Sequence, residues 1–155
     1  MGEKLGRRVQ KRRVDSSPLE GVGTFIYSTS THRYLFILRN TKKYAGTWGL
    51  AGGAIEAGEN LLESLHRELT EELGYDFSGT KVIPIEKFTS DKNNFSYHTF
   101  IIPVAEEFVP KLNYEHRGYC WVELDDHPKP LHPGVWRTIN FKEVIGKIKT
   151  IESIL

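Results

Sequence analysis

Three glutamates within five residues are the side chains of this chain whose types and spacing most clearly could do chemistry. Glu68, Glu71 and Glu72 are spaced i, i+3 and i+4, so on a helix they would share one face. Each like-charged pair of this kind destabilises a helix by roughly a few tenths of a kcal/mol, a cost that a solvated face tolerates. A divalent cation would reverse the cost, because Mg²⁺ binds hard oxygen ligands such as carboxylates and phosphates. The spacing alone leaves both a metal site and a solvated acidic face open.

The surrounding segment predicts the element that must position these glutamates, a helix over residues 60–73. Asn60 is a favourable N-cap, and Glu63 can complete a capping box. Gly74 stands where a glycine commonly ends a helix. Gly52 and Gly53, before the helix, allow a close backbone approach and can offer carbonyl and N–H groups. The stripe expected to face the core is made of leucines, at Leu61, Leu62, Leu65, Leu69 and Leu73.

The same segment resembles the Nudix box of the Nudix hydrolase family. All seven fixed positions of that motif are present, as Gly53, Glu59, Arg67, Glu68, Glu71, Glu72 and Gly74. Two neighbouring positions depart from the common pattern, because Tyr75 replaces an aliphatic residue and Ala51 stands where many relatives have proline. These departures concern packing and the stiffness of a turn, and they leave the charged positions intact.

This resemblance implies an α/β (α+β) fold, namely an α/β/α sandwich with a mixed β-sheet between helices. It also implies hydrolysis of a phosphoanhydride bond in a nucleoside diphosphate derivative, with Mg²⁺ or Mn²⁺ as cofactor. The implied metal ligands are oxygen donors, at Gly52, Glu68, Glu71 and Glu72.

The resemblance assigns catalytic roles as well, to Glu68, Glu72, Arg67 and Glu59. Arg67 would orient the helix glutamates by pairing with Glu59. Either Glu68 or a carboxylate beyond the box would act as the general base.

A second similarity covers residues 114–122, which read YEHRGYCWV. They resemble the E-H-x-x-Y-x-W segment of Nudix enzymes that cut dinucleoside polyphosphates and some nucleoside triphosphates. In those relatives the glutamate helps to hold a metal, so Glu115 is the candidate fourth carboxylate, with a plain surface glutamate as the alternative. His116 is expected in a loop and not as a ligand. The favoured substrate is therefore a dinucleoside polyphosphate or a (d)NTP, and ADP-ribose or another nucleotide sugar is the alternative.

Candidate substrate-binding residues are fewer and less specific. Arg39, at the end of a predicted strand, could meet a phosphate bidentately. Tyr44 and Tyr97, together with Phe95, could stack on a nucleobase. Each of these residues has an ordinary surface or packing role as its alternative.

The remaining elements predict a sheet that carries this helix. Strands are expected over residues 22–28 and 34–40, paired as a hairpin, and then over 48–50, 81–89, 95–104 and 118–124. Pro84 places the strand over 81–89 at a sheet edge or a bulge. A loop over 125–133 follows, and the apolar spacing then predicts one helix from about residue 138 to the end.

Composition bounds the class of protein. A chain of 155 residues suits one domain, and 39% hydrophobic with 26% charged residues excludes a wholly disordered chain. Cys120 is the single cysteine, which excludes an intrachain disulfide. No apolar run approaches the ~20 residues of a membrane span, and the N-terminal residues lack the apolar core of a signal peptide. We therefore expect a cytoplasmic protein without a membrane partner, for which a homodimer stays open.

The N-terminus carries a net positive charge, whereas the rest of the chain is net negative. Residues 1–13 hold six basic side chains and one acidic side chain, so residues 1–17 read as a basic arm before a single domain over 18–155. Such an arm can be merely solvated, or it can bind nucleic acid, which would suit an RNA 5′-pyrophosphohydrolase. The arm also supports a non-catalytic nucleotide- or RNA-binding module with the same fold. Because a binding module has no need for clustered, mutually repelling glutamates, the sequence favours an enzyme.

Overall fold

The computed structural model describes residues 19–92 and 94–155, so the predicted basic arm over residues 1–17 lies outside the described residues. The strands are β1 (Leu19–Ser28), β2 (Arg33–Arg39), β3 (Trp48–Gly49), β4 (Ala51–Ala54), β5 (Ile83–Thr89), β6 (Phe95–Val104) and β7 (His116–Val122). The helical segments are α2 (Leu61–Leu73), the 3₁₀ turn η1 (Leu124–Asp126), α3 (Pro133–Ile139) and α4 (Lys142–Ile154). None of the described helices is long and apolar enough to cross a membrane.

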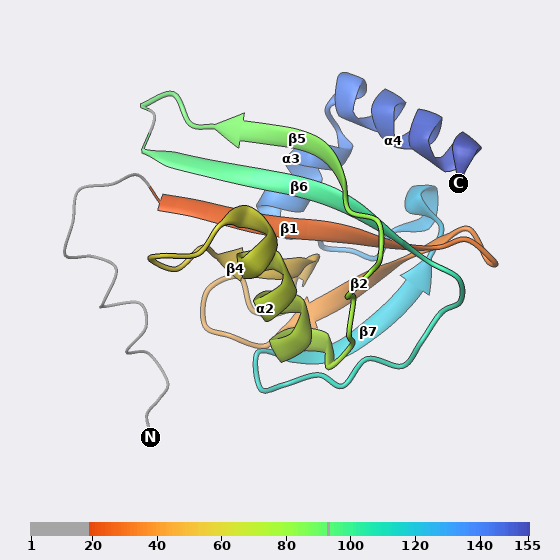
Figure 1. The fold of residues 1–155 in the computed structure, drawn as a ribbon, viewed down its shortest axis with the longest axis horizontal. Helices are drawn as coiled ribbons and strands as arrows, with labels where there is room; N and C mark the ends of the chain where they lie inside the picture. The colour runs from red at the N-terminus through yellow and green to blue at the C-terminus, as the bar shows by residue number, and fades with distance from the viewer. Residues whose placement is uncertain (1–18, 93) are drawn as a thin grey trace.

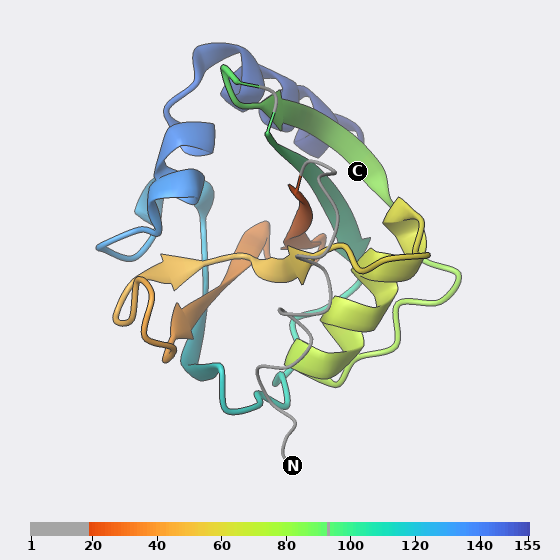
Figure 2. The same ribbon diagram turned by 90° about the vertical axis from the view of Figure 1, so that its left-hand side faces the viewer.

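The described strands form one mixed seven-stranded sheet centred on β1. One edge of β1 pairs in parallel with β6 along its whole length, from Leu19 opposite Phe95 to Ser28 opposite Val104. The other edge is shared, because residues 21–24 pair antiparallel with β4 whereas residues 27–28 pair with β2. Since β1 has two partners on this edge, the sheet divides into a wing of β4, β1, β6 and β5 and a wing of β3, β2 and β7, which spread apart in Figure 2.

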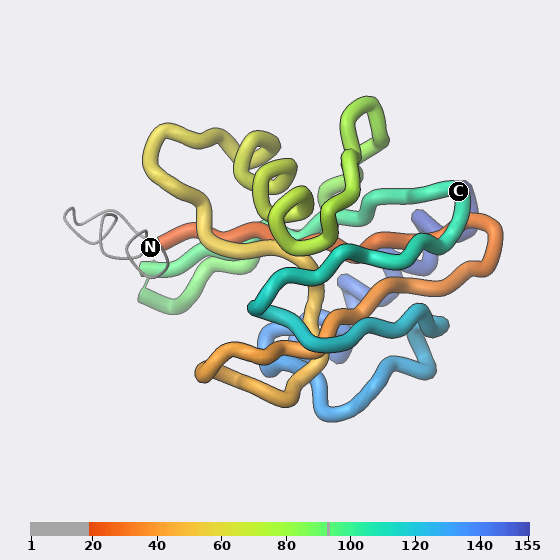
Figure 3. The backbone as a smooth tube through the Cα atoms, turned by 90° about the horizontal axis from the view of Figure 1, so that it is seen from below, coloured from red at the N-terminus to blue at the C-terminus, as the bar shows by residue number. Residues whose placement is uncertain are grey.

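Alternating side chains of the sheet build a core on each face. Val22 and Ile26 of β1 belong to the cluster that packs under α2, whereas Phe25 and Tyr27 belong to the cluster that packs under α3 and α4. Figures 1 and 3 show α2 over one face of the strands and the C-terminal helices over the other. The predicted α/β/α sandwich with a mixed sheet is therefore confirmed.

Several element boundaries agree with the sequence prediction, and Pro84 lies where the prolines of strands are tolerated. β5 is an edge strand of the sheet, and its register with β6 shifts between Pro84 and Glu86. The first hairpin and the strand over residues 95–104 are also present as predicted.

Four expectations were wrong. The single C-terminal helix is two helices, because Phe141 has an extended backbone (φ −90°, ψ 112°) that interrupts it. Leu62 is 58% exposed and lies outside the buried stripe, which the other leucines of α2 form or flank. His116 is the first residue of β7 and is 6% exposed, so it is not a loop residue. The turn expected at Ala51 and the glycines that follow it is a strand, β4, because it pairs with β1.

Candidate active site

Helix α2 holds its carboxylates at a fixed rotation because both of its ends are capped. The Asn60 side chain accepts a hydrogen bond from the Glu63 N–H at 2.8 Å, and the Glu63 carboxylate accepts one from the Asn60 N–H at 3.0 Å. Gly74 ends the helix in the left-handed conformation, at φ 63°. Between these caps, Leu69 is fully buried against the sheet. This fixes the rotation of α2 so that Glu68 and Glu72 face β4.

Strand β4 provides the surface on which these glutamates lie. The Gly52 N–H donates a hydrogen bond to Glu72 Oε1 at 2.8 Å. A Cβ atom at Gly53 would meet the Glu68 carboxylate, and one at Gly52 would meet the backbone carbonyl of Val22 in β1. Glycine is therefore required twice, once for the approach of α2 and once for the pairing with β1.

Arg67 is the cation around which the carboxylates gather. Its Nε and Nη2 donate to the two oxygens of Glu59, at 2.6 and 3.0 Å, which is a bidentate pair. Nη1 donates to Glu68 Oε2 at 3.2 Å and to Glu71 Oε1 at 3.5 Å. Nη2 also donates to the Ala54 carbonyl at 3.1 Å, which ties the guanidinium to β4. The Arg67 hydrogen bonds lower the pKa of Glu59, so that carboxylate stays charged.

Glu68 and Glu72 are buried close to other carboxylates, and Arg67 does not fully compensate the negative charge of this cluster. Glu68 and Glu72 are 6% and 4% exposed. Burial raises the pKa of Glu68 to about 7, although Arg67 opposes the rise. Burial, and then the charge of Glu68, raise the pKa of Glu72 well above its usual value. The charge of Glu115 acts on both groups in the same direction, which places it at the same cluster.

This donor set fits a divalent cation, because it gathers hard oxygen donors where a cation would relieve their repulsion. Glu68, Glu72 and Glu115 line a cavity of about 220 Å³, whereas Glu71 is exposed and is not among its lining residues. Among the described residues, no group of three or more His, Cys, Asp or Glu side chains is arranged closely enough to hold a metal ion without movement. Glu72 is instead held by the Gly52 N–H and Glu68 by Arg67.

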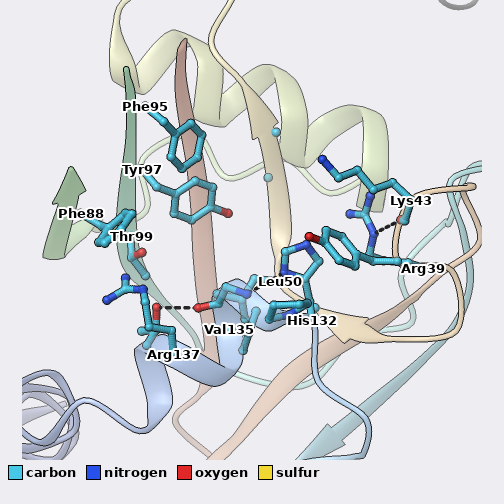
Figure 4. Close-up of a pocket in the computed structure, with 17 residues that line it drawn as sticks. Arg39, Lys43, Leu50, Phe88, Phe95, Tyr97, Thr99, His132, Val135 and Arg137 are labelled. Carbon is cyan, nitrogen blue, oxygen red and sulfur yellow. Dashed lines mark hydrogen bonds between the residues drawn. The ribbon is translucent and has the colours of Figure 1, made fainter. Parts of the chain in front are cut away.

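A second cavity, of about 600 Å³, lies beside the smaller one and is shown in Figure 4. It lies between the two wings of the sheet and α3, and it shares Arg39, Gly52 and Gly53 with the smaller cavity. Arg39 donates to the Lys43 carbonyl at 3.3 Å and to Thr41 Oγ1 at 3.1 Å. This guanidinium therefore stands where the two cavities meet.

The predicted aromatic residues also line this larger cavity. The Tyr97 ring lies over Gly23 of β1, and Phe95 stacks beside it with ring centroids 6.2 Å apart. Burial raises the pKa of the Tyr97 hydroxyl, so that it stays protonated. Tyr44 has a left-handed backbone at φ 60°, and its ring meets His132 edge-on with centroids 4.6 Å apart.

Several residues at these cavities were not predicted from the sequence, namely His116, Phe88, His132 and Arg137. His116 Nδ1 has no hydrogen-bond partner within the described residues, and burial lowers the pKa of this imidazole to about 4. One available signal was Pro133 directly after His132, which is a helix-start pattern. It would have placed α3, and with it Arg137, before the helix that was predicted.

Comparison with known proteins gives similarities along the chain. The family profile described as NUDIX domain matches residues 18–141. The nucleoside triphosphatase NudI of Escherichia coli is 30% identical over 93 residues, which cover 54% of this chain and 66% of that protein. The match thus spans slightly less than two thirds of this relative's length.

Solved structures share the fold. The MutT NUDIX hydrolase from Burkholderia pseudomallei has a TM-score of 0.61 and 26% identity, covering 78% of this chain and 95% of that one. The NUDIX domain of Shewanella oneidensis NrtR, solved with ADP ribose, has a TM-score of 0.67 and 15% identity, covering 88% and 92%.

Proposed function

This chain belongs to the NUDIX family, and we propose from that premise that it hydrolyses a phosphoanhydride bond of a nucleoside triphosphate or dinucleoside polyphosphate. The observation that carries the proposal is the junction of the two cavities at Arg39, Gly52 and Gly53. An aromatic-lined space large enough for a nucleoside thereby opens onto buried carboxylates. The similarity to a nucleoside triphosphatase supports the triphosphate in particular.

The residues that would hold Mg²⁺ or Mn²⁺ are Glu68, Glu72 and Glu115, which line the smaller cavity. The Gly52 carbonyl and Glu71 are further proposed ligands, as the family resemblance implies. A bound divalent cation neutralises phosphate charge and lowers the pKa of a coordinated water.

The other residues of the site would bind and orient the substrate. Arg39 would bind a phosphate group with its guanidinium, because it lies between the nucleoside cavity and the carboxylates. Arg67 would keep Glu68 in place through its pair with Glu59. Glu68 or Glu115 would accept the proton of the attacking water, since both line the smaller cavity.

The test is a nucleotide panel with Mg²⁺ and with Mn²⁺, with products identified by mass. The panel holds NTPs, dNTPs, diadenosine tetraphosphate, ADP-ribose and triphosphorylated RNA. Glu72→Gln removes one buried carboxylate charge, and we expect kcat to fall about a hundredfold or more. Glu106→Gln, at an exposed residue outside both cavities, is the matched control and keeps wild-type turnover.

The mass of the products assigns the cleaved bond and therefore the substrate class. Binding of nucleotides without metal-dependent turnover of any panel member would overturn the proposed hydrolase and leave a nucleotide-binding module.

A further inference from the structure

Arg137 of α3 lies at the far side of the larger cavity from Arg39 (Figure 4). Its guanidinium carbon lies 4.1 Å from the centroid of the Phe88 ring, and its Nη2 donates to Glu86 Oε2 at 3.2 Å. Glu86 also accepts a hydrogen bond from the Thr138 hydroxyl at 3.4 Å. The stacking and the ion pair together fix the plane of the guanidinium. The bond to Glu86 uses one of its five N–H groups, so further donors can meet a ligand.

His132 adds a second donor to the same cavity. Its Nδ1 accepts a hydrogen bond from the Gly134 N–H at 3.0 Å, so the proton of the neutral ring is on Nε2. Burial lowers the pKa of His132, which keeps the ring neutral. The imidazole therefore offers an N–H and no second acceptor.

The cavity is correspondingly poor in acceptors. Among the described residues that line it, none is Asp, Glu, Asn or Gln, and the side-chain acceptors are hydroxyl groups. Arg39 and Lys43 add further cationic donors on the opposite side. The described side chains of this cavity therefore offer a ligand N–H and O–H donors but no carboxylate or amide acceptor.

The two ends of a nucleotide can be placed in this cavity by charge. Phosphates belong at Arg39, Gly52 and Gly53, because these residues also line the carboxylate cavity. Arg137 does not line that smaller cavity, so the base is the part of the nucleotide that reaches it. This placement rests on the proposed function, since it assigns the larger cavity to a nucleotide.

We propose that Arg137 selects nucleotides whose base carries a carbonyl oxygen at C6 of a purine or C4 of a pyrimidine, namely guanine, hypoxanthine, uracil or thymine, over adenine and cytosine. The keto bases carry an acceptor where adenine and cytosine carry an amino donor. An amino group facing Arg137 and His132 sets donor against donor, so these donors gain no partner from the base. Arg137 is thus a specificity-determining residue and takes no part in bond cleavage.

The experiment compares ITP with ATP and UTP with CTP, because the members of each pair differ at one exocyclic group and the adjacent ring nitrogen. With Mg²⁺ present, we expect kcat/KM to favour the keto member of each pair about tenfold or more. The preference is expected in KM, since the base lies away from the reacting phosphates. Equal kcat/KM within both pairs would overturn the inference.

Arg137→Gln replaces the donor-only group with an amide that both donates and accepts. The ITP-to-ATP ratio is expected to fall toward one, whereas Lys149→Gln, an exposed residue of α4, keeps the wild-type ratio. Thermal melting of both variants controls for folding. An equal loss for all four triphosphates would make Arg137 a phosphate contact, and a ratio unchanged by Arg137→Gln would also contradict the proposal.

Calorimetric binding of IMP and AMP without metal separates this inference from the proposed activity. Tighter binding of IMP that Arg137→Gln abolishes would support base selection even if no triphosphate were hydrolysed. Equal binding of IMP and AMP, together with turnover of ITP and ATP at equal kcat/KM, would support the hydrolase and reject the base selection.

Discussion

Glu68 is a carboxylate that the folded chain accommodates at a cost to its own stability. Its pKa is about 7 in the folded protein, against an ordinary value of 4.5. Because the folded state binds the proton more tightly, the stabilising contribution of this group is complete below about pH 4.5 and is lost as the pH rises to about 7. At pH 8 the loss approaches ~3 kcal/mol, at about 1.4 kcal/mol per pKa unit.

We therefore expect Glu68→Gln to raise the melting temperature of the metal-free protein at pH 8 by several degrees. The gain over wild type should shrink as the pH falls from 7 and should vanish well below pH 4.5, where Glu68 is protonated in both states. Added Mg²⁺ should stabilise wild type more than the variant, because the variant lacks one carboxylate charge. Glu106→Gln is again the control, and a lower melting temperature for Glu68→Gln at pH 8 would contradict this account.

The face of the helix on which a glutamate lies could be predicted from local spacing. The i, i+3, i+4 pattern places Glu68 and Glu72 on one side of α2, and Asn60 and Gly74 cap this helix as expected. Burial was not predictable from spacing, since Glu71 stays exposed while its neighbour Glu72 is buried. The difference comes from β4, which covers one flank of the helix and not the other.

At the scale of elements, the two adjacent glycines of β4 should respond differently to the same substitution. Gly53→Ala places a methyl group at the Glu68 carboxylate, so we expect turnover to fall sharply while the melting temperature changes little. Gly52→Ala places it at the Val22 carbonyl, and overpacking against the β1 backbone should cost ~1–3 kcal/mol of stability. Turnover and thermal melting of the two variants separate these effects.

Gly146→Ala in α4 is the matched control. A Cβ there has nothing within 4 Å, and alanine in a helix should stabilise the protein by about 0.5–1 kcal/mol. If Gly53→Ala retained wild-type turnover, the close contact between β4 and Glu68 would not matter for activity.

Elements with clear local signals were found, whereas a strand without such a signal, β4, was not. Residues 60–73 carry their own caps, so the helix was placed to within one residue. Strand β4 reads as a turn because glycine disfavours strands, and it exists because β1 pairs with it. The predicted C-terminal helix began at about residue 138, inside the last turn of α3, because the apolar spacing continues through Asn140 and Phe141, where the backbone turns.

At the scale of the molecule, α4 lies beyond the NUDIX match over residues 18–141 and completes the core on its face of the sheet with Val144, Ile148 and Ile151. Ile148 is fully buried there, and the Tyr34 hydroxyl donates to Glu152 at 2.5 Å, which links α4 to β2. We expect Ile148→Ala to cost ~2–5 kcal/mol of stability, because it leaves a cavity.

The active site should keep its turnover in Ile148→Ala, since Ile148 and the glutamates of α2 lie on opposite faces of the sheet. Denaturant unfolding measures the stability, and kcat at a temperature where the variant stays folded checks the site. Loss of kcat in the folded variant would instead show that α4 supports catalysis. The basic arm over residues 1–17 lies outside the described residues, and its role stays a prediction.

The parallel pairing of β1 with β6 has a consequence for how the chain is made. Hydrogen-bonded neighbours such as Thr24 and Phe100 are 76 positions apart, and a ribosome delivers the N-terminal part first. While one edge of β1 still lacks its partner β6, the ribosome has therefore already released β2, β4 and helix α2. An open strand edge invites pairing with other chains, so the half-synthesised protein is the form most exposed to aggregation, until β6 emerges to cover that edge.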